Sequence, residues 1–449
     1  MAGAGAQVKR ILFRGAQAFV DGKQSQIDLL VEDRLIAALA PADSLSASPS
    51  DVVVDASGLF LAPGFHDIHV HLREPGQSHK ETIGSGTRAA ARGGFARIAC
   101  MPNTRPVLDS AEQLQSLRKR LWTDAVVAVD VIAAVTMGSA GDVLTDFAAL
   151  RSAGAVALSD DGRGIQRAAV MRQALLRAAE VGLPIFAHCE DESLSHLGVI
   201  HEGATARDRC LVGIPSEAEA VHVARDIVLS EKSGAHYHVC HLSCAQSLEL
   251  VRSAKARGLR VSCEVTPHHL LLSDSDIASD DGNFKMNPPL RTESDRAALL
   301  AGLCDGTVDA IATDHAPHTP AEKARGLAAA PFGVIGLETA FPLLYTELVL
   351  RNLLSLERLV ELLTCGPARI LSSPIPKLAV SAPADLVLLD LKTERVVRVE
   401  ELRSRSRNTP FLHRPLRGWP VLTLCQGQVA FSSLAQLPEP VAAPSASAL

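Results

Sequence analysis

Short apolar runs alternate with longer amphipathic segments over most of the chain, and this alternation predicts its architecture. Between most of the runs lies a segment of helical spacing that ends in glycine, such as MRQALLRAAEVG (171–182). Repeated strand–helix units predict a parallel (β/α)8 barrel. The eight candidate strands are 65–71, 96–103, 127–136, 155–162, 184–190, 236–243, 260–269 and 309–317.

A doubly wound open sheet would show the same alternation of strands and helices. Folds of that class usually carry a glycine-rich phosphate-binding turn after the first strand. Here the first strand is followed by LREPGQSHK (72–80), which has no such fingerprint. The barrel is therefore the predicted fold.

The pattern changes at both ends of the chain. Residues 8–62 read as short strands separated by turn signals, and strand patterns return at 383–391 and 420–431. They predict a small β-sandwich domain built from both termini. The expected division is 1–62 and 380–434 for this domain, 63–379 for the barrel, and 435–449 for a disordered tail rich in Pro, Ala and Ser.

Composition narrows the class of protein. The net charge of -6 leaves no basic surplus to neutralise phosphates, which argues against nucleic acid as a partner. The nine cysteines are odd in number, irregularly spaced and without a CxxC pair, as expected for thiols in a reducing cytosol. No apolar run is long enough for a signal peptide core or a membrane span. We therefore expect a cytoplasmic protein without a membrane partner.

Candidate chemistry begins on the first barrel strand. His69 and His71 leave a strand on the same face, about 6–7 Å apart at the backbone, which suits two imidazoles closing on one metal ion. Arg73 continues this face and is suited to hold an anion. A strand with two packed histidines would show the same short motif.

Polar residues recur where later strands end. Asp160 and Asp161 end the fourth strand, His188 the fifth, His241 the sixth and Asp314 the eighth. The active sites of such barrels lie at these strand ends. Nitrogen and oxygen ligands without thiolate suit a catalytic zinc or a similar divalent ion, and two ions can share the site if one carboxylate bridges them. Such a site activates water and polarises a carbonyl.

Longer motifs accompany these residues in one order along nearly the whole chain. They are DIHVHLREP (67–75), GSGTRAAARGGF (84–95), MPNTRPV (101–107), SDDG (159–162), AHCED (187–191), HYHVCHLS (236–243), EVTPHHLLL (264–272), FKMNPPLR (284–291), ATDHAPHT (312–319) and PFGVIGLETAFPLLYT (331–346). In these motifs the chain resembles the amidohydrolase superfamily and, within it, the dihydroorotases of the bacterial type I class. The ATDHAPHT and FKMNPPLR motifs are much more specific than the paired histidines alone.

The resemblance implies a zinc site with one or two ions, two being favoured. His69 and His71 would bind one ion, His188 and His241 the other, and Asp161 would bridge them. Many superfamily members use a carboxylated lysine as the bridge, but AVALSDDG (155–162) contains no lysine.

The resemblance also implies the reaction, which is the reversible cyclisation of N-carbamoyl-L-aspartate to L-dihydroorotate with loss of water in pyrimidine biosynthesis. Asp314 would bind the first zinc ion and act as general acid and base. A homodimer is common in the family, and a complex with another enzyme of the pathway would fit it. The implied substrate contacts are His71, Arg73, Asn103, Asn287, His318, Phe332 and Gly333.

Two other functions compete with this one. An allantoinase or hydantoinase of the same superfamily usually has the bridging lysine that is missing here. A silent paralogue that serves as a scaffold typically loses metal ligands, whereas all six are present. We further expect 318–333, which lacks clear helix caps, to form either a loop over the site or an ordinary surface loop. His236 and His238 are expected to face the packing of the barrel or its helices.

Overall fold

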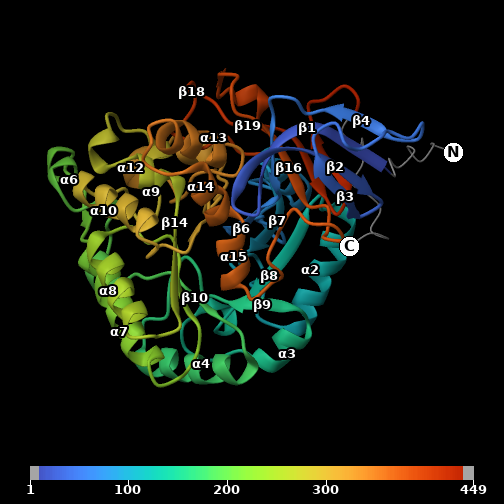
Figure 1. Ribbon diagram of the computed structural model, residues 1–449. Helices are drawn as coiled ribbons and strands as arrows, with labels where there is room; N and C mark the ends of the chain where they lie inside the picture. The colour runs from blue at the N-terminus through green and yellow to red at the C-terminus, as the bar shows by residue number, and fades with distance from the viewer. Residues whose placement is uncertain (1–9, 438–449) are drawn as a thin grey trace.

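The computed structural model describes residues 10–437, and its centre is a parallel barrel (Figure 1). Eight strands pair with their neighbours in chain order. A parallel bridge between Val70 and His315 brings the two ends of the series together, and the His71 N–H donates to the His315 carbonyl at 2.9 Å. The predicted barrel is confirmed. Its strands are β6 (Phe65–Val70), β7 (Phe95–Cys100), β8 (Ala128–Ala133), β9 (Ala155–Leu158), β10 (Ile185–Ala187), β13 (Tyr237–Val239), β14 (Val261–Val265) and β15 (Ala310–Ile311).

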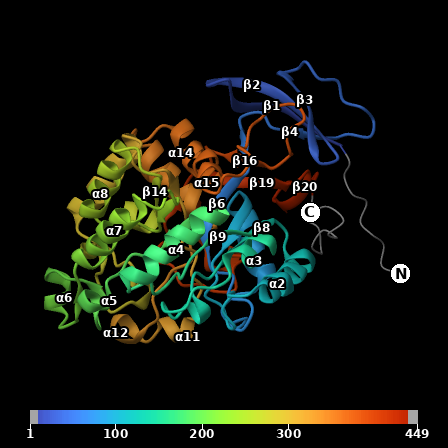
Figure 2. The same cartoon turned by 90° about the horizontal axis from the view of Figure 1, so that it is seen from below.

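Helices cover the outside of the barrel (Figure 2). Helix α1 shows why they form, because Thr82 caps its N-terminus with Ser85 in a capping box and its alanines face the strands. Helix α4 ends at Gly182, which has a φ of 67°. The covering helices are α1 (Ile83–Arg92), α2 (Ala111–Asp124), α3 (Phe147–Ser152), α4 (Ala168–Val181), α7 (Glu217–Ser230), α8 (Ala245–Ala256), α10 (Glu293–Cys304), α14 (Leu356–Leu363) and α15 (Cys365–Ile370).

A second sheet of eight strands draws on both ends of the described chain, as predicted. Strand β5 joins the two halves, since Leu61 pairs with Leu388 and Pro63 with Leu386 of β16. The inner face of the sheet buries its own aliphatic cluster. The strands are β1 (Arg10–Val20), β2 (Lys23–Glu32), β3 (Leu35–Pro41), β4 (Val52–Asp55), β5 (Phe60–Pro63), β16 (Leu386–Asp390), β19 (Trp419–Cys425) and β20 (Gln428–Ser432).

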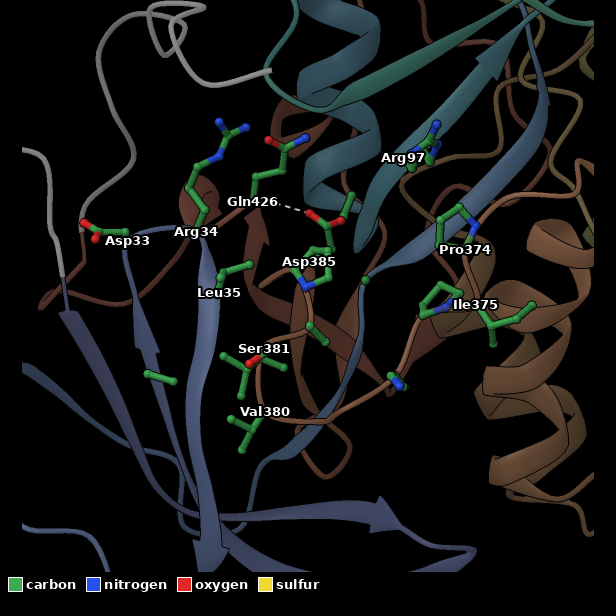
Figure 3. A pocket seen from close by; sticks show the side chains of 18 of the residues that line it. Asp33, Arg34, Leu35, Arg97, Pro374, Ile375, Val380, Ser381, Asp385 and Gln426 are labelled. Carbon is green, nitrogen blue, oxygen red and sulfur yellow. Dashed lines mark hydrogen bonds between the residues drawn. The ribbon is translucent and has the colours of Figure 1, made fainter.

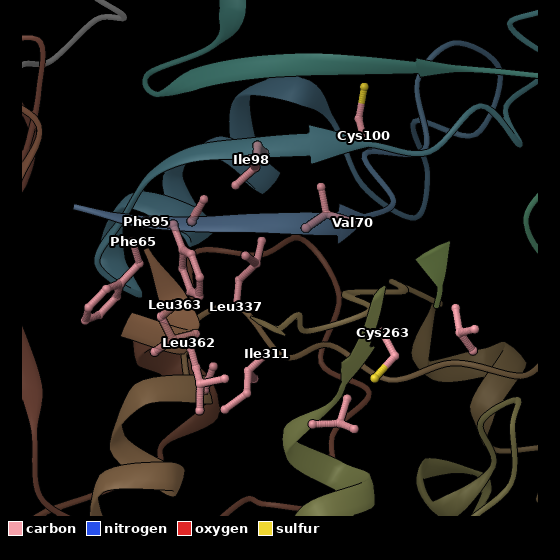
Figure 4. Close-up of a cluster of buried hydrophobic side chains, with 14 of the residues drawn as sticks. Phe65, Val70, Phe95, Ile98, Cys100, Cys263, Ile311, Leu337, Leu362 and Leu363 are labelled. Atoms are coloured by element: carbon pink, nitrogen blue, oxygen red, sulfur yellow. The ribbon is translucent and has the colours of Figure 1, made fainter. Parts of the chain in front are cut away.

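The largest buried cluster lies between the barrel strands and the surrounding helices (Figure 4). Phe65 of β6 anchors it, with its ring 5.7 Å from Phe95 and 5.0 Å from Phe341. Most other members are aliphatic, as the low aromatic content of 4% requires. This layer fixes β6, the strand that carries the first two candidate metal ligands.

One sequence prediction is wrong in detail. Residues 318–333 contain two short helices, α11 (Pro320–Lys323) and α12 (Gly326–Ala329). Thr319 caps α11 and shares a capping box with Glu322. The signal was present as Thr-Pro-Ala-Glu, a capping box with proline at the first helical position. Other short elements near the site are α5 (Glu192–Ser195), α6 (Ala204–Asp208), α9 (Pro267–Leu271), α13 (Ala340–Leu344), β11 (Ile200–His201) and β12 (Gly213–Ile214).

A cavity of about 1150 Å³ lies where the small sheet meets the amino ends of β6 and β7 (Figure 3). Leu35 and Val380 face Ile375 across it, and Asp385 accepts the backbone N–H of Gln426 at 2.6 Å. The candidate metal ligands lie at the opposite, carboxyl ends of the strands, so this cavity is separate from them.

All nine cysteines are free thiols, as expected. Within residues 10–437, no helix is long and apolar enough to cross a membrane. The predicted tail, 435–449, lies for the most part outside the described residues.

A partly buried ion pair near the amino end of the barrel gives a stability prediction. Asp130 of β8 accepts from Arg97 Nε at 2.6 Å and from Arg97 Nη2 at 2.7 Å. Burial alone would raise the pKa of Asp130, but His66 and Arg97 outweigh it and hold the pKa below its ordinary value. Asp130→Asn should lower the free energy of unfolding at pH 7 by about 1–3 kcal/mol, measured by urea denaturation.

Because the folded-state pKa is depressed, this stabilisation is complete above the unfolded-state value and is lost as the pH falls through the folded one. The difference between parent and Asp130→Asn should therefore shrink below about pH 4. Asp142→Asn is the matched control, since Asp142 forms an exposed pair with Arg167. An equal loss of stability at pH 7 and pH 3 would contradict the assignment.

Candidate metal centre

The six residues predicted as ligands lie together at the carboxyl ends of the barrel strands. His69 and His71 come from β6 and its end, and Asp161 follows β9. His188 and His241 follow β10 and β13, and Asp314 follows β15. All six are at most 7% exposed. The parallel register of the strands thus brings side chains that are distant in sequence to one buried point.

Asp161 is the carboxylate common to all four histidines. Its Oδ1 lies 3.4 Å from His69 Nε2, 3.7 Å from His188 Nδ1 and 3.6 Å from His241 Nε2. Its Oδ2 lies 3.5 Å from His71 Nε2. Burial alone would raise the pKa of Asp161, but the imidazoles around it hold the pKa well below its ordinary value. The geometry of Asp161 is thus that of a carboxylate placed between two pairs of imidazoles.

Asp314 faces only the first pair. Its Oδ1 lies 3.0 Å from His71 Nε2 and 3.5 Å from His69 Nε2. Burial alone would raise its pKa, but the hydrogen bond with His71 and the charge of nearby imidazoles lower it. The carboxylate is therefore held ionised beside one pair of histidines.

The residues fit a metal ion on two observations. His69, His71 and Asp314 form one group whose ligand atoms lie within 4.8 Å of one another, and His69, Asp161 and His241 form a second. In addition, His69 Nε2 and Asp161 Oδ1 are buried without a hydrogen-bond partner within residues 10–437. Buried polar atoms are rarely left without a partner, and a cation at this point would supply one.

The backbone is strained at three positions of the site. Arg73, His241 and Asp314 have φ values of 61°, 34° and 46°. The left-handed region costs such residues on the order of 1–3 kcal/mol each, so neighbouring contacts must hold them there. Asp67 is one such contact, because it accepts from the Thr313 hydroxyl at 2.5 Å and from the His69 N–H at 3.0 Å. The strain turns side chains at strand ends towards the ligand cluster.

Sequence reasoning missed Glu264, a fully buried carboxylate on β14. Its Oε1 lies 2.7 Å from His69 Nδ1, so the other ring nitrogen of His69 faces the cluster. An outer carboxylate on a ligand histidine fixes the tautomer and orientation of the ring. The only sequence signal was an acidic residue inside an apolar strand, in RVSCEV (260–265).

Cys240 lies beside His69 and Glu264 in a third group of possible ligands. Burial raises the pKa of Cys240 well above its ordinary value, with a further rise from Glu264. A thiol that stays protonated is a poor ligand. Glu264 also has both oxygens engaged by imidazoles, so this group supports His69 and is not a separate metal site.

The residues predicted to contact substrate form two sets. Arg73 and His318 lie together, since Arg73 Nη2 is 3.3 Å from His318 Nε2 and Arg73 Nε donates to the Pro317 carbonyl at 3.1 Å. His318 Nε2 also contacts the Phe332 carbonyl at 2.7 Å, and Lys80 Nζ lies 3.2 Å from His318 Nδ1. These side chains form one edge of the site.

Asn103 and Asn287 lie closer to the ligands than predicted. Asn103 Oδ1 is 2.9 Å from His71 Nδ1, and its Nδ2 donates to Asp161 Oδ2 at 3.0 Å. Asn287 Nδ2 donates to Glu190 Oε2 at 2.7 Å, and the same oxygen lies 3.1 Å from His188 Nε2. Both amides therefore orient ligand residues in addition to any contact with substrate.

The Phe332–Gly333 segment is held by a lysine that sequence reasoning did not select. Lys323 is 4% exposed, and its ammonium donates to the carbonyls of Lys285, Pro331 and Gly333 at 2.8 to 3.0 Å. The Gly333 N–H donates to the Lys285 carbonyl at 3.0 Å. These bonds join two motifs that border the site, and they require helix α11 to be folded.

Comparisons with known proteins agree with this geometry. The family model "Dihydro-orotase-like" matches residues 58–247. A protein of Geobacillus sp. named dihydroorotase is 51% identical over 421 residues, or 94% of this chain and 98% of its own. Another dihydroorotase, from Staphylococcus epidermidis, is 48% identical over 94% of this chain and 99% of its own.

Solved structures of similar fold include the L-hydantoinase (dihydropyrimidinase) of Arthrobacter aurescens. It has a TM-score of 0.85 and 25% identity, with 96% of this chain and 97% of that one covered. A D-hydantoinase of Thermus sp. has a TM-score of 0.79 and 25% identity, with 94% and 95% covered. These similarities agree with the barrel and its terminal sheet.

Fold and site together define a metal-dependent cyclic amidohydrolase. About half of all positions are identical to those of the two dihydroorotases over nearly the whole chain. The protein therefore belongs to the dihydroorotase family.

The contact between Glu264 and His69 gives a prediction about metal affinity. Glu264→Gln keeps the shape of the side chain but removes the charge that holds the His69 Nδ1–H. Affinity for a divalent metal should fall by about 10- to 100-fold, measured by competition with a chromophoric chelator. Glu338→Gln is the control. Glu338 is also buried, at 3% exposed, but it accepts hydrogen bonds from backbone N–H groups that are distant in sequence and not from a candidate ligand. Equal affinities for the two variants would refute the role of Glu264.

Proposed function

We propose that the centre binds two zinc ions and that the protein is a dihydroorotase, which interconverts N-carbamoyl-L-aspartate and L-dihydroorotate plus water. His69, His71 and Asp314 would hold one ion, and His188 and His241 the other. The observation that carries this proposal is the position of Asp161, whose oxygens lie 3.4 to 3.7 Å from all four imidazoles. A carboxylate so placed would take the position of the carboxylated lysine that many related enzymes use as the bridge.

Zinc, when bound, supplies Lewis acidity that lowers the pKa of water and polarises a carbonyl. A side chain of the protein transfers the proton. In the hydrolytic direction, water adds to the ring carbonyl carbon, the bond from this carbon to the ring nitrogen breaks, and one proton must pass from the water to the nitrogen. Asp314 is the proposed carrier, because it is buried, ionised and beside His71 at 3.0 Å. In the reverse direction, Asp314 takes the proton from the nitrogen that closes the ring and passes it to the departing water.

Arg73 is the proposed partner of the substrate carboxylate. Burial lowers its pKa to about 10, and it stays cationic at neutral pH. His318 offers no competing charge, because burial and the nearby Arg73, Lys80 and Lys323 lower its pKa to about 2. Its neutral ring donates from Nε2 to the Phe332 carbonyl and accepts from Lys80 at Nδ1. A fixed guanidinium in this place can bind a carboxylate through two parallel N–H groups. Asn103, Asn287 and the Phe332–Gly333 segment would complete the pocket.

Three further statements belong to the proposal. The pairing of β5 with β16 supports the division into a terminal β domain (1–62 and 380–434) and a barrel (63–379). A homodimer is proposed from the family resemblance, and light scattering in solution should give twice the 47.5 kDa of one chain. A cytoplasmic location and a further enzyme of the pathway as partner are proposed on the same ground.

The decisive experiment pairs metal analysis with an assay. Purified protein should contain up to two zinc ions per chain and should hydrolyse L-dihydroorotate, while hydantoin, the substrate of the proposed rival, should react far more slowly. Asp314→Asn should reduce turnover in both directions by at least about 100-fold, since it cannot carry the proton. Preference for hydantoin would refute the assignment, and a variant with more than a hundredth of the parent activity would refute the role of Asp314.

A second prediction concerns the carboxylate partner. Arg73→Ala should raise the KM for dihydroorotate by about 10- to 100-fold, with a smaller effect on kcat, because a charge-assisted contact with bound substrate is lost. Steady-state kinetics of parent and variant provide the measurement. Arg105→Ala serves as control, since Arg105 is exposed. An unchanged KM would exclude Arg73 from substrate binding.

A further inference from the structure

Polar side chains line the interior of the barrel between β13 and β14. Ser262 is 6% exposed, and His238 and Glu264 are fully buried. By the alternation of a strand, His236 and His238 share one face of their segment, as do Ser262 and Glu264. Elsewhere the interior holds residues such as Ile68, Ala99, Met101, Ile132 and Ala157.

Hydrogen bonds join these side chains without a gap. His236 Nε2 lies 2.7 Å from Ser262 Oγ, which lies 2.8 Å from His238 Nδ1. His238 Nε2 lies 3.2 Å from Glu264 Oε2, and Glu264 Oε1 lies 2.7 Å from His69 Nδ1. The series runs from a half-buried histidine at the amino end of the barrel to a proposed metal ligand at the carboxyl end.

The order of donors and acceptors in the series follows from Glu264. Each oxygen of Glu264 lies beside one imidazole nitrogen, Oε1 beside His69 Nδ1 and Oε2 beside His238 Nε2. An ionised carboxylate only accepts, so His69 Nδ1 and His238 Nε2 must both donate. His238 Nδ1 then accepts from the Ser262 hydroxyl, and the Ser262 oxygen accepts from His236 Nε2. Each ring nitrogen in the series therefore has one defined role.

We propose that His238 and Ser262 are positioning residues that hold Glu264 against His69, so that His69 presents its Nε2 lone pair to the metal. This inference rests on the proposed metal site. Neither residue touches the ligand cluster directly, because both act through Glu264. Packing supports the arrangement, since the Phe186 ring lies 4.4 Å from the His238 ring and limits its rotation.

The energetic cost of the series argues for such a role. A buried polar group without a partner costs on the order of 1–3 kcal/mol, and a series of four such residues is stable only when every member is paired. An apolar layer, such as that of Ile68, Ala99 and Ile132, would serve packing alone. The structure instead places the series where its last member contacts a ligand histidine.

Removal of the Ser262 hydroxyl is the sharpest test. Ser262→Ala removes the hydroxyl that donates to His238 Nδ1. His238→Phe removes the hydrogen bonds to Ser262 and to Glu264 but keeps an aromatic ring beside Phe186. Affinity for Zn²⁺, measured by chelator competition, should fall about 10-fold in each variant, and the Co²⁺-substituted protein should show an altered visible absorption spectrum. Ser262→Thr keeps the hydroxyl and should restore both properties.

Ser247→Ala is the matched control. Ser247 is fully buried on α8 and pairs with Cys244 Sγ at 3.1 Å. The variant therefore loses a buried hydroxyl, as Ser262→Ala does, without affecting Glu264. It should bind Zn²⁺ as the parent does. If the parent binds Zn²⁺ and both test variants bind it equally well, the positioning role is wrong and the proposed function stands. If the parent binds no divalent metal, the proposed function and this role both fail.

A second measurement does not depend on the variants. Nitrogen NMR of imidazole-labelled, metal-free parent protein should show His238 neutral with its proton on Nε2. A neutral ring with the proton on Nδ1, or a doubly protonated ring, would contradict the donor order and overturn the proposal even if the variants failed to fold.

Discussion

The site depends on the orientation of its imidazole rings, and in metal sites a fixed partner on the second ring nitrogen usually sets that orientation. His69 meets this condition through Glu264 and His71 through Asn103. His188 has Glu190 at 3.1 Å from its Nε2. The partners of His69 and His71 come from other strands, so the orientation of these two rings depends on the closed barrel.

Closure of the barrel has a local consequence for the chemistry. The bridge from Val70 to His315 lies beside Asp314, and Asp67 holds Thr313 from the other side. Asp314 is therefore fixed between two contacts of β6, the strand that supplies His69 and His71. The left-handed backbone at Asp314 is maintained by these neighbours and turns its carboxylate towards the histidines. The contacts that close the barrel thus also fix the position of Asp314 beside the histidines.

The barrel, the terminal sheet and the clustering of six candidate ligands were predictable from sequence, because period and strand-end position are local signals. Glu264 was not, since its role depends on the register of β14 against β13 and β6, which no local pattern encodes. The additional contacts of Asn103 and Asn287 with Asp161 and Glu190 depend on tertiary packing in the same way. The helix at Pro320 was predictable, and its capping box was overlooked.

The pairing of β5 with β16 has a consequence for synthesis of the chain. Strand β5 precedes the entire barrel, and β16 follows it, so the edge of β5 that faces β16 cannot be covered until almost the whole polypeptide has left the ribosome. During translation the amino-terminal strands carry an open edge with unpaired backbone groups, the kind of surface on which chains associate wrongly. Chaperone dependence and yield during expression should therefore be governed by the late strands β16, β19 and β20, which lie outside the barrel that carries the candidate ligands.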